Sequence, residues 1–146
     1  RGIRAAMRKH SPTMQLSSTF MAEIHRATEE AGQWPVQWVE EDLVDWVVPM
    51  VYKRKTADLL ETIETLKSFF APEDSKKLVY GLNADFNSKA EVQRQLLVTE
   101  NEKNGGEALF AYTTVFPNHT ENGKAEVIRA FWQEEILKHL LLSSQP

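Results

Sequence analysis

Residues 43–52 read LVDWVVPMVY, a run with no polar side chain between Trp46 and Tyr52. A strand with one solvated face alternates apolar and polar residues, so this continuous apolar pattern predicts a strand that is buried on both faces. Pro49 cannot donate a ladder hydrogen bond, and we expect it at a bulge or near the end of the strand. We expect Trp46 in the core. In α/β proteins built on such strands, the chemistry lies where the strands end.

Helical patterns separate this strand from three other strand-like segments. The four predicted strands are residues 14–20, 43–52, 77–82 and 107–115. The main helical patterns cover residues 1–10, 35–42, 56–70 and 89–103, and a last one has an apolar stripe from Val127 to Leu140. The polar residues 22–33 are expected as a solvated helix or as an ordered excursion without one. Thr56 and Ser88 are expected as N-caps, and Glu91, three residues after Ser88, completes a capping-box spacing.

The strands recur at an almost constant interval. Counted from residues 14, 44, 77 and 107, they begin 30, 33 and 30 residues apart. Each interval holds one strand and at least one helix, which is the right-handed βα unit, so the sequence predicts a wholly parallel sheet in a single α/β unit over residues 1–146.

Two α/β architectures fit this pattern. Even spacing fits a (β/α)8 TIM barrel, but the chain holds four of the eight units, and it would need another half: an upstream segment, a second chain or a copy of itself. Arg1 is not an initiator Met, and the helix that it opens reads like the end of a longer one, so we expect a fragment. The rival is a small, doubly wound, flavodoxin-like sheet that is complete in itself.

Composition excludes several classes of function. The chain has 146 residues, of which 42% are hydrophobic and 10% aromatic, enough for one globular core. A net charge of -4 argues against a nucleic-acid surface. The absence of cysteine excludes disulfides and thiol nucleophiles, and no apolar run approaches the roughly 20 residues of a membrane span.

Four short motifs carry a family resemblance. In order they are DWVVPMVY (residues 45–52), LVYGL (78–82), VQRQL (92–96) and GGEALFAY (105–112). Together they resemble the C-terminal half of the glycosyl-hydrolase-like family 10 barrels. Met50 and Lys53 stand where that family commonly has Gln and Trp, and Ala111 where it has Ser.

The resemblance implies the last four strands of a TIM barrel that hydrolyses glycosidic bonds of a polysaccharide. It also implies an extracytoplasmic or cell-surface location, and it places further catalytic acids in an upstream half. The substrate itself is not identified by any of the motifs.

Candidate site residues follow from the expected strand ends. Glycoside hydrolysis needs two carboxyl groups, and Asp85 is the acid that we expect close behind a strand end, with an Asx turn as its alternative role. Asp45 lies at the opposite end of its strand, where a structural role is expected. Aromatic, amide and hydroxyl groups suit a sugar. The expected substrate-binding residues are Ser18, Tyr52, Lys53, Asn83, Tyr112 and Thr114.

No metal or cofactor is predicted. The four histidines are scattered without a carboxylate pattern, and the glycines at 105 and 106 precede a strand where a phosphate loop would follow one. Three functions stay open: a glycoside hydrolase, a non-catalytic carbohydrate-binding or assembly module, and a flavodoxin-like regulatory domain. The expected partners are a poly- or oligosaccharide and the other half of the barrel, whether an N-terminal segment or a second copy.

Overall fold

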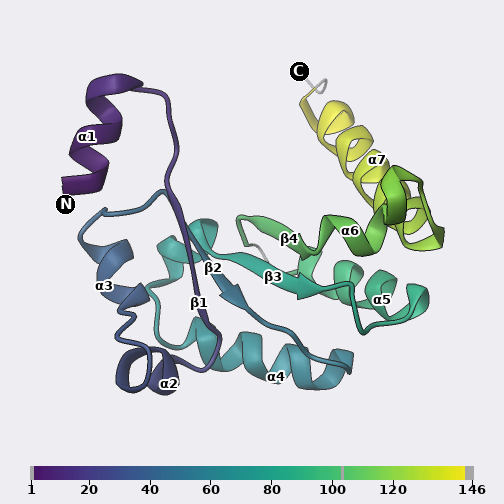
Figure 1. The fold of residues 1–146 in the computed structure, drawn as a ribbon, viewed down its shortest axis with the longest axis horizontal. Coiled ribbons are helices and arrows are strands. Elements are labelled where there is room, and N and C mark those ends of the chain that lie inside the picture. Colours follow the sequence, from purple (N-terminus) through teal and green to yellow (C-terminus); the bar gives the residue numbers. More distant parts are fainter. Residues whose placement is uncertain (1, 103, 144–146) are drawn as a thin grey trace.

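A computed structural model describes the chain over residues 2–102 and 104–143, with the side chains of the last helix described as far as residue 134. Helices and strands alternate along it (Figure 1). The strands are β1 (Ser17–Met21), β2 (Trp46–Met50), β3 (Val79–Asn83) and β4 (Gly106–Phe110). The α-helices are α1 (Gly2–His10), α2 (Ile24–Glu29), α3 (Pro35–Glu40), α4 (Thr56–Lys67), α5 (Lys89–Glu100), α6 (Tyr112–Val115) and α7 (Gly123–Ser143), with 3-10 turns at Pro72–Lys77 and Pro117–His119.

The four strands form one parallel sheet in the order β1-β2-β3-β4. This confirms the predicted parallel α/β class. The flavodoxin order begins with the second strand next to the first and the third on the far side of the first, so the strand order here differs from that alternative. Strands that follow one another in both sequence and space are joined by short βα units on one side of the sheet.

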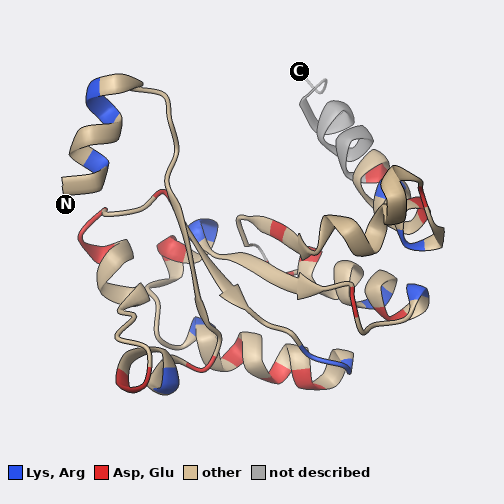
Figure 2. Ribbon diagram, in the orientation of Figure 1, with Lys and Arg blue, Asp and Glu red and all other residues tan. Residues whose placement is uncertain are grey.

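Charged residues lie mainly on the helices and loops (Figure 2). Strands β1, β2 and β3 read SSTFM, WVVPM and VYGLN, without a charge, and β4 carries Glu107. Uncharged strands suit a sheet whose side chains leave water on folding.

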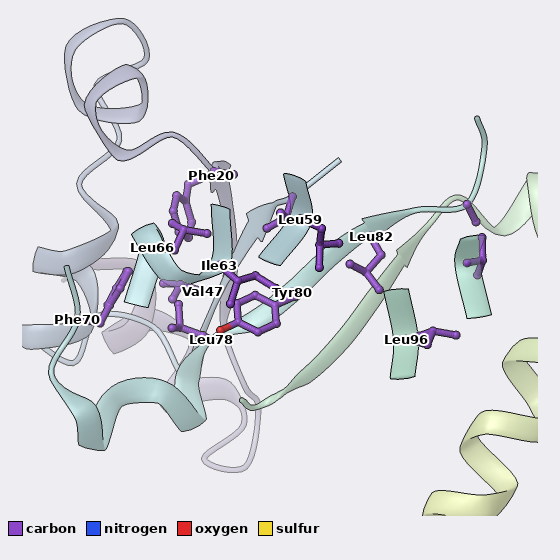
Figure 3. Close-up of a cluster of buried hydrophobic side chains, with 14 of the residues drawn as sticks. Phe20, Val47, Leu59, Ile63, Leu66, Phe70, Leu78, Tyr80, Leu82 and Leu96 are labelled. Carbon is purple, nitrogen blue, oxygen red and sulfur yellow. The ribbon is translucent and has the colours of Figure 1, made fainter. Parts of the chain in front are cut away.

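One face of the sheet carries the core. Leu59, Ile63 and Leu66 of α4 and Leu96 of α5 gather with Val47, Tyr80 and Leu82 of the strands (Figure 3). Each of these side chains is at most 1% exposed. The predicted helical stripes of residues 59–66 and 92–96 therefore cover the sheet as expected, while Ile136, Leu137 and Leu140 of the last stripe lie outside the described side chains.

The opposite face, which we call the open face, is covered much less. Residues paired in register share a face, and one row runs Met21, Met50, Gly81, Ala108 across all four strands. All but Gly81 in this row are partly exposed. Trp46 is 38% exposed on the same face of β2, so the expectation that it belongs to the core is wrong for the described chain.

The outer strands are shorter than predicted because their pairing partners end. In β4 the last registered pair joins Asn83 to Phe110, and the Ala84 amide donates to the Phe110 carbonyl at 2.7 Å. Beyond this point β3 offers no partner, and the chain turns into α6. Residues 112–115 therefore form a helix where the sequence predicts strand.

The first strand is shifted in the same way. It begins at Ser17, where its pairing with Trp46 begins, and ends at Met21. Upstream, Asp45 accepts a hydrogen bond from the Leu16 amide at 2.6 Å and pairs with Arg4 of α1 at 3.0 Å. The structural role expected for Asp45 is confirmed, because it fixes the entry into the sheet.

Pro49 lies next to the last residue of β2, near the strand's end as predicted. The ladder between β2 and β3 is correspondingly sparse, with a registered pair at Met50 and Gly81 and an isolated bridge from Val47 to Leu78. At Gly81 an added Cβ would lie 2.9 Å from the Pro49 carbonyl oxygen, so the close approach of the two backbones depends on this glycine.

The Tyr80 hydroxyl is buried beneath the helices without a hydrogen-bond partner among the described residues, and burial raises its pKa above the ordinary value. We expect Tyr80→Phe to raise the free energy of unfolding by about 1 kcal/mol, because it removes an unsatisfied polar group from the core. Urea denaturation followed by tryptophan fluorescence measures the change. The control, Tyr112→Phe, alters a side chain that is 60% exposed and should leave stability unchanged. A loss of stability in Tyr80→Phe would contradict the assignment.

Candidate functional site: the strand-end rim

The carboxyl ends of four parallel strands meet at one edge of the sheet, which we call the rim. It consists of the segments that follow the strands, residues 22–23, 51–55, 84–88 and 111–122. Most of the predicted site residues fall here. Asn83 is the last residue of β3, directly before the rim, and Ser18 lies within β1, half-buried and paired with Val47.

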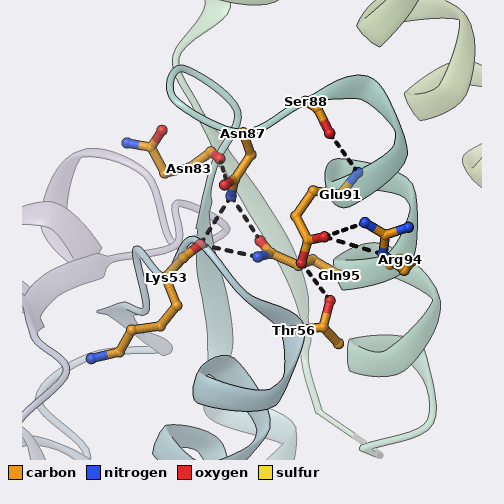
Figure 4. Close-up of polar contacts among 8 residues, drawn as sticks. All are labelled: Lys53, Thr56, Asn83, Asn87, Ser88, Glu91, Arg94 and Gln95. Carbon is orange, nitrogen blue, oxygen red and sulfur yellow. Dashed lines mark hydrogen bonds and ion pairs between the residues drawn. The ribbon is translucent and has the colours of Figure 1, made fainter.

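A buried polar network holds two rim segments together (Figure 4). The main-chain carbonyl of Lys53 accepts hydrogen bonds from the Asn87 and Gln95 side chains, both at 3.0 Å. Asn87 also donates to the Asn83 carbonyl at 3.0 Å and to the Gln95 amide oxygen at 3.2 Å. Asn87 is 4% and Gln95 1% exposed, so these bonds are shielded from water and fix the path of both loops.

Asn83 shapes the loop after β3. Its side-chain oxygen accepts from the Asp85 amide at 2.7 Å and the Phe86 amide at 3.2 Å, which is the geometry of an Asx turn. The turn expected around Asp85 therefore exists, but Asn83 makes it. Asn83 is 7% exposed and its side-chain oxygen is used by the turn, so it shapes the loop and offers little surface to a ligand.

An aromatic pair stands at the rim. The rings of Tyr52 and Phe110 stack with centroids 5.7 Å apart and planes 26° apart, joining the segment after β2 to the end of β4. Phe110 is 55% exposed, and partial burial raises the pKa of Tyr52. The pair offers an exposed apolar surface of the kind against which a sugar ring stacks.

Charged groups also lie along the rim. The ammonium of Lys53 lies 2.8 Å from Glu23, and this hydrogen bond lowers the pKa of the Glu23 carboxyl. The Arg54 guanidinium lies over the Phe86 ring, 4.5 Å from its centroid. Both contacts leave charged groups at the solvated side of the rim, where they can form hydrogen bonds to hydroxyl groups.

Asp85 has a side-chain partner from the next rim segment. The Thr114 hydroxyl donates to Asp85 Oδ1 at 3.1 Å, so two predicted site residues are brought together. Lys124 of α7 donates to the Ala84 carbonyl at 2.5 Å and to the Asp85 carbonyl at 3.3 Å. The loop that presents Asp85 is thus held from two sides.

Tyr112 lies apart from the aromatic pair. Its ring stacks on Phe116 at 4.9 Å, within the helical segment that replaces the end of the predicted strand. It also lines a hollow of about 510 Å³ between β4, α6 and α7. The lining is mostly apolar, with Leu109, Val115, Phe116, Ile128 and Trp132 contributing. Trp132 is 45% exposed there.

The first residues of α4 and α5 set the outer part of the rim. The Ser88 hydroxyl accepts from the Glu91 amide at 3.2 Å, which confirms the predicted N-cap. Thr56 is not an N-cap, since it is the first residue of α4, and its hydroxyl donates instead to Glu91 Oε1 at 2.7 Å. Arg94 and Thr56 together lower the pKa of Glu91, so one carboxylate joins the first turns of α4 and α5.

Sequence reasoning missed Glu23 and Phe110. Because β1 extends to Met21, Glu23 follows a strand end as closely as Asp85 does. Phe110 was missed because the sequence predicts a strand that continues to residue 115, and residue 110 then lies inside the strand and not at its end. The end of β4 is set by its pairing with β3, which stops at the Asn83 turn, and the sequence of β4 carries no signal of that pairing.

The site and the fold define a parallel α/β protein with an aromatic and polar surface at its strand ends. In the described ranges, no group of three or more His, Cys, Asp or Glu residues is placed to hold a metal ion. Nor does any described helix have the length and apolar character needed to cross a membrane. Comparison with models of protein families, with curated proteins and with solved structures finds no match to this chain.

Proposed function

We propose that the chain forms four units of a (β/α)8 barrel of the glycosyl-hydrolase-like kind, and that its rim binds a poly- or oligosaccharide. The observation that carries this proposal is the stacked pair Tyr52 and Phe110 at the strand ends, on a rim that also holds the charged side chains of Lys53 and Glu23. Aromatic faces next to fixed hydrogen-bonding groups are the common elements of a carbohydrate site.

The barrel part of the proposal is supported by the sheet. Sequential parallel order, helices on the core side and a largely uncharged open face are the features expected of barrel strands, whose inward side chains fill the interior. The even strand spacing and the four family-like motifs add to this support.

Binding is better supported than hydrolysis by these residues alone. Glu23 and Asp85 follow strands that are two positions apart, so their backbones are separated by roughly 10 Å, near the upper limit for an inverting pair. Glu23 is also held by Lys53. Asp85 stays the candidate acid, with its carboxyl oriented by Thr114, and a second carboxyl would come from outside the four units.

We expect Tyr52→Ala to weaken oligosaccharide binding about fivefold, because the loss of one stacked aromatic face costs on the order of 1 kcal/mol. The measurement is calorimetric titration with a panel of hexasaccharides: cellohexaose, chitohexaose and maltohexaose. Tyr52→Phe keeps the ring and should retain most of the affinity. Leu97→Ala, which removes an exposed apolar side chain from α5 outside the rim, is the control and should bind like the native chain.

Circular dichroism of each variant establishes that it is folded before the titration. Equal affinity of Tyr52→Ala and the native chain would remove the aromatic pair from the site. Failure of every hexasaccharide to bind the native chain would contradict the proposed function as a whole.

A further inference from the structure

The open face of the sheet is more exposed to solvent than the sequence of β2 predicts. The pattern of β2 and its flanks is that of a strand buried on both faces, yet Val47 is fully buried while Trp46 on the other face is 38% exposed. Thr19, on the same face of β1, is also exposed. A second layer over this face would resolve the difference.

Both outer strands have one unpaired edge among the described residues, since β1 and β4 are the ends of the strand order. Free edges in monomeric proteins are usually protected by lysines, prolines or bulges that prevent further pairing. Strand β1, SSTFM, contains none of these residues, and β4, GEALF, contains a single charge. The two edges are therefore able to accept another strand.

The hollow beside β4 lies where such a strand would need space. It is bounded by Leu109 on the core side of β4 and by Ile128 and Trp132 of α7. In a sheet that continued past β4, the side chains of the next strand that point toward the helices would enter this hollow and bury its apolar lining.

We propose that a second copy of this chain covers the open face, with β1 of each copy pairing in parallel with β4 of the other. The result is an eight-stranded barrel with a two-fold axis. This inference rests on the barrel part of the proposed function and adds the identity of the partner that closes it.

The helices allow a copy of the chain to be the partner. A (β/α)8 barrel has one helical layer for each of its eight strands. Following β1, β2, β3 and β4, the chain supplies α2 with α3, then α4, α5 and α7, which is one layer per strand. Helix α1 stands away from the sheet (Figure 1) and is held by ion pairs of Arg4 to Asp42 and Asp45, so it leaves the outer edge of β1 free.

The side chains of the open face also suit the interior of such a barrel. Eight strands enclose a space that side chains just fill, arranged in layers. The row Met21, Met50, Gly81, Ala108 combines two long flexible side chains with two small ones, and the two-fold axis repeats it on the far side. The axis sets each of these side chains opposite its own copy, so the flexible methionines of the two chains meet across the interior beside the small residues, and no charge is brought into it from this row.

The first test measures mass in solution. Sedimentation equilibrium of the native chain at micromolar concentration should give twice its 16.8 kDa. Thr19→Lys places a charge on the open face and should give a folded species with the mass of one chain, whereas Thr65→Lys, on the outer side of α4, should stay dimeric. A native chain with the mass of one copy, or a series of larger species without a defined dimer, would overturn the proposal.

The second test locates the contact, and it uses the absence of native cysteine. Differently tagged Thr19→Cys and Ala108→Cys chains are mixed and treated with a short bismaleimide. Within one chain these residues are three strands apart, roughly 14 Å, so rapid linkage between the two chains is expected only at the proposed seam. Thr19→Cys mixed with Glu64→Cys is the control and should remain unlinked. A dimer that links no better at the seam than in the control would overturn the proposed pairing.

The two proposals fail separately. A chain that binds hexasaccharide with the mass of one copy overturns the two-fold barrel and leaves the rim as a binding site. A cross-linked dimer that binds no hexasaccharide supports the two-fold barrel and overturns the proposal that the rim binds a saccharide.

Discussion

Leu96→Ala should lower the free energy of unfolding by about 2–5 kcal/mol, because it leaves a cavity beneath α5 where the structure has little room to collapse. Leu96 is fully buried against the sheet. Its neighbour Leu97 is 45% exposed on the same helix and provides the matched control. Leu97→Ala makes the same chemical change and should alter stability by less than about 0.5 kcal/mol.

Urea denaturation of both variants, followed by circular dichroism, measures the difference. Both substitutions replace leucine by alanine in the middle of one helix, so the change in helix propensity is the same in both variants and cancels in the comparison. Similar losses of stability in the two variants would show that α5 presents a different side to the sheet.

A comparably large loss is expected for Gly81→Ala, about 2–3 kcal/mol, because the added methyl group meets backbone that cannot move cheaply. The new Cβ would lie 2.9 Å from the Pro49 carbonyl oxygen and 3.4 Å from the Met50 Cα atom. The strand β2 would be pushed away from β3 at the registered pair that holds these strands together.

Gly123→Ala is the control for this prediction. A Cβ at that position meets only the side chain of Lys89, at 3.2 Å from its Cδ atom, and this side chain can rotate away. Thermal unfolding should therefore show a clear decrease in melting temperature for Gly81→Ala and almost none for Gly123→Ala. Equal melting temperatures would mean that β2 and β3 approach each other less closely at this point.

Local sequence patterns predicted what depends on local physics. The strand at residues 46–50, the helix after Ser88 and the parallel order of the sheet follow from apolar periodicity, a capping residue and regular spacing. Asp45 was also placed correctly, because an acid before a strand, at the end away from the rim, has structural partners more often than ligands.

The remaining features depend on contacts between distant residues. The end of β4 is set by the Asn83 turn in the neighbouring strand, so the β-branched residues after Tyr112 become helical despite their intrinsic preference. The pairing of β1 with β2 moves the first strand toward Met21, which takes Ser18 away from the rim and brings Glu23 to it. A single sequence does not contain these pairings in readable form.

The loop that carries Tyr52 and Arg54 is anchored through a main-chain atom. The carbonyl oxygen of Lys53 accepts hydrogen bonds from the side chains of Asn87 and Gln95. The Lys53 side chain points away from this anchor (Figure 4). Residues 52–54 can therefore be randomised in a library while the course of the loop is retained, provided that Asn87 and Gln95 are kept. In evolution, new ligand preferences can likewise arise by exchange of the side chains at residues 52–54 while the rest of the fold is unchanged.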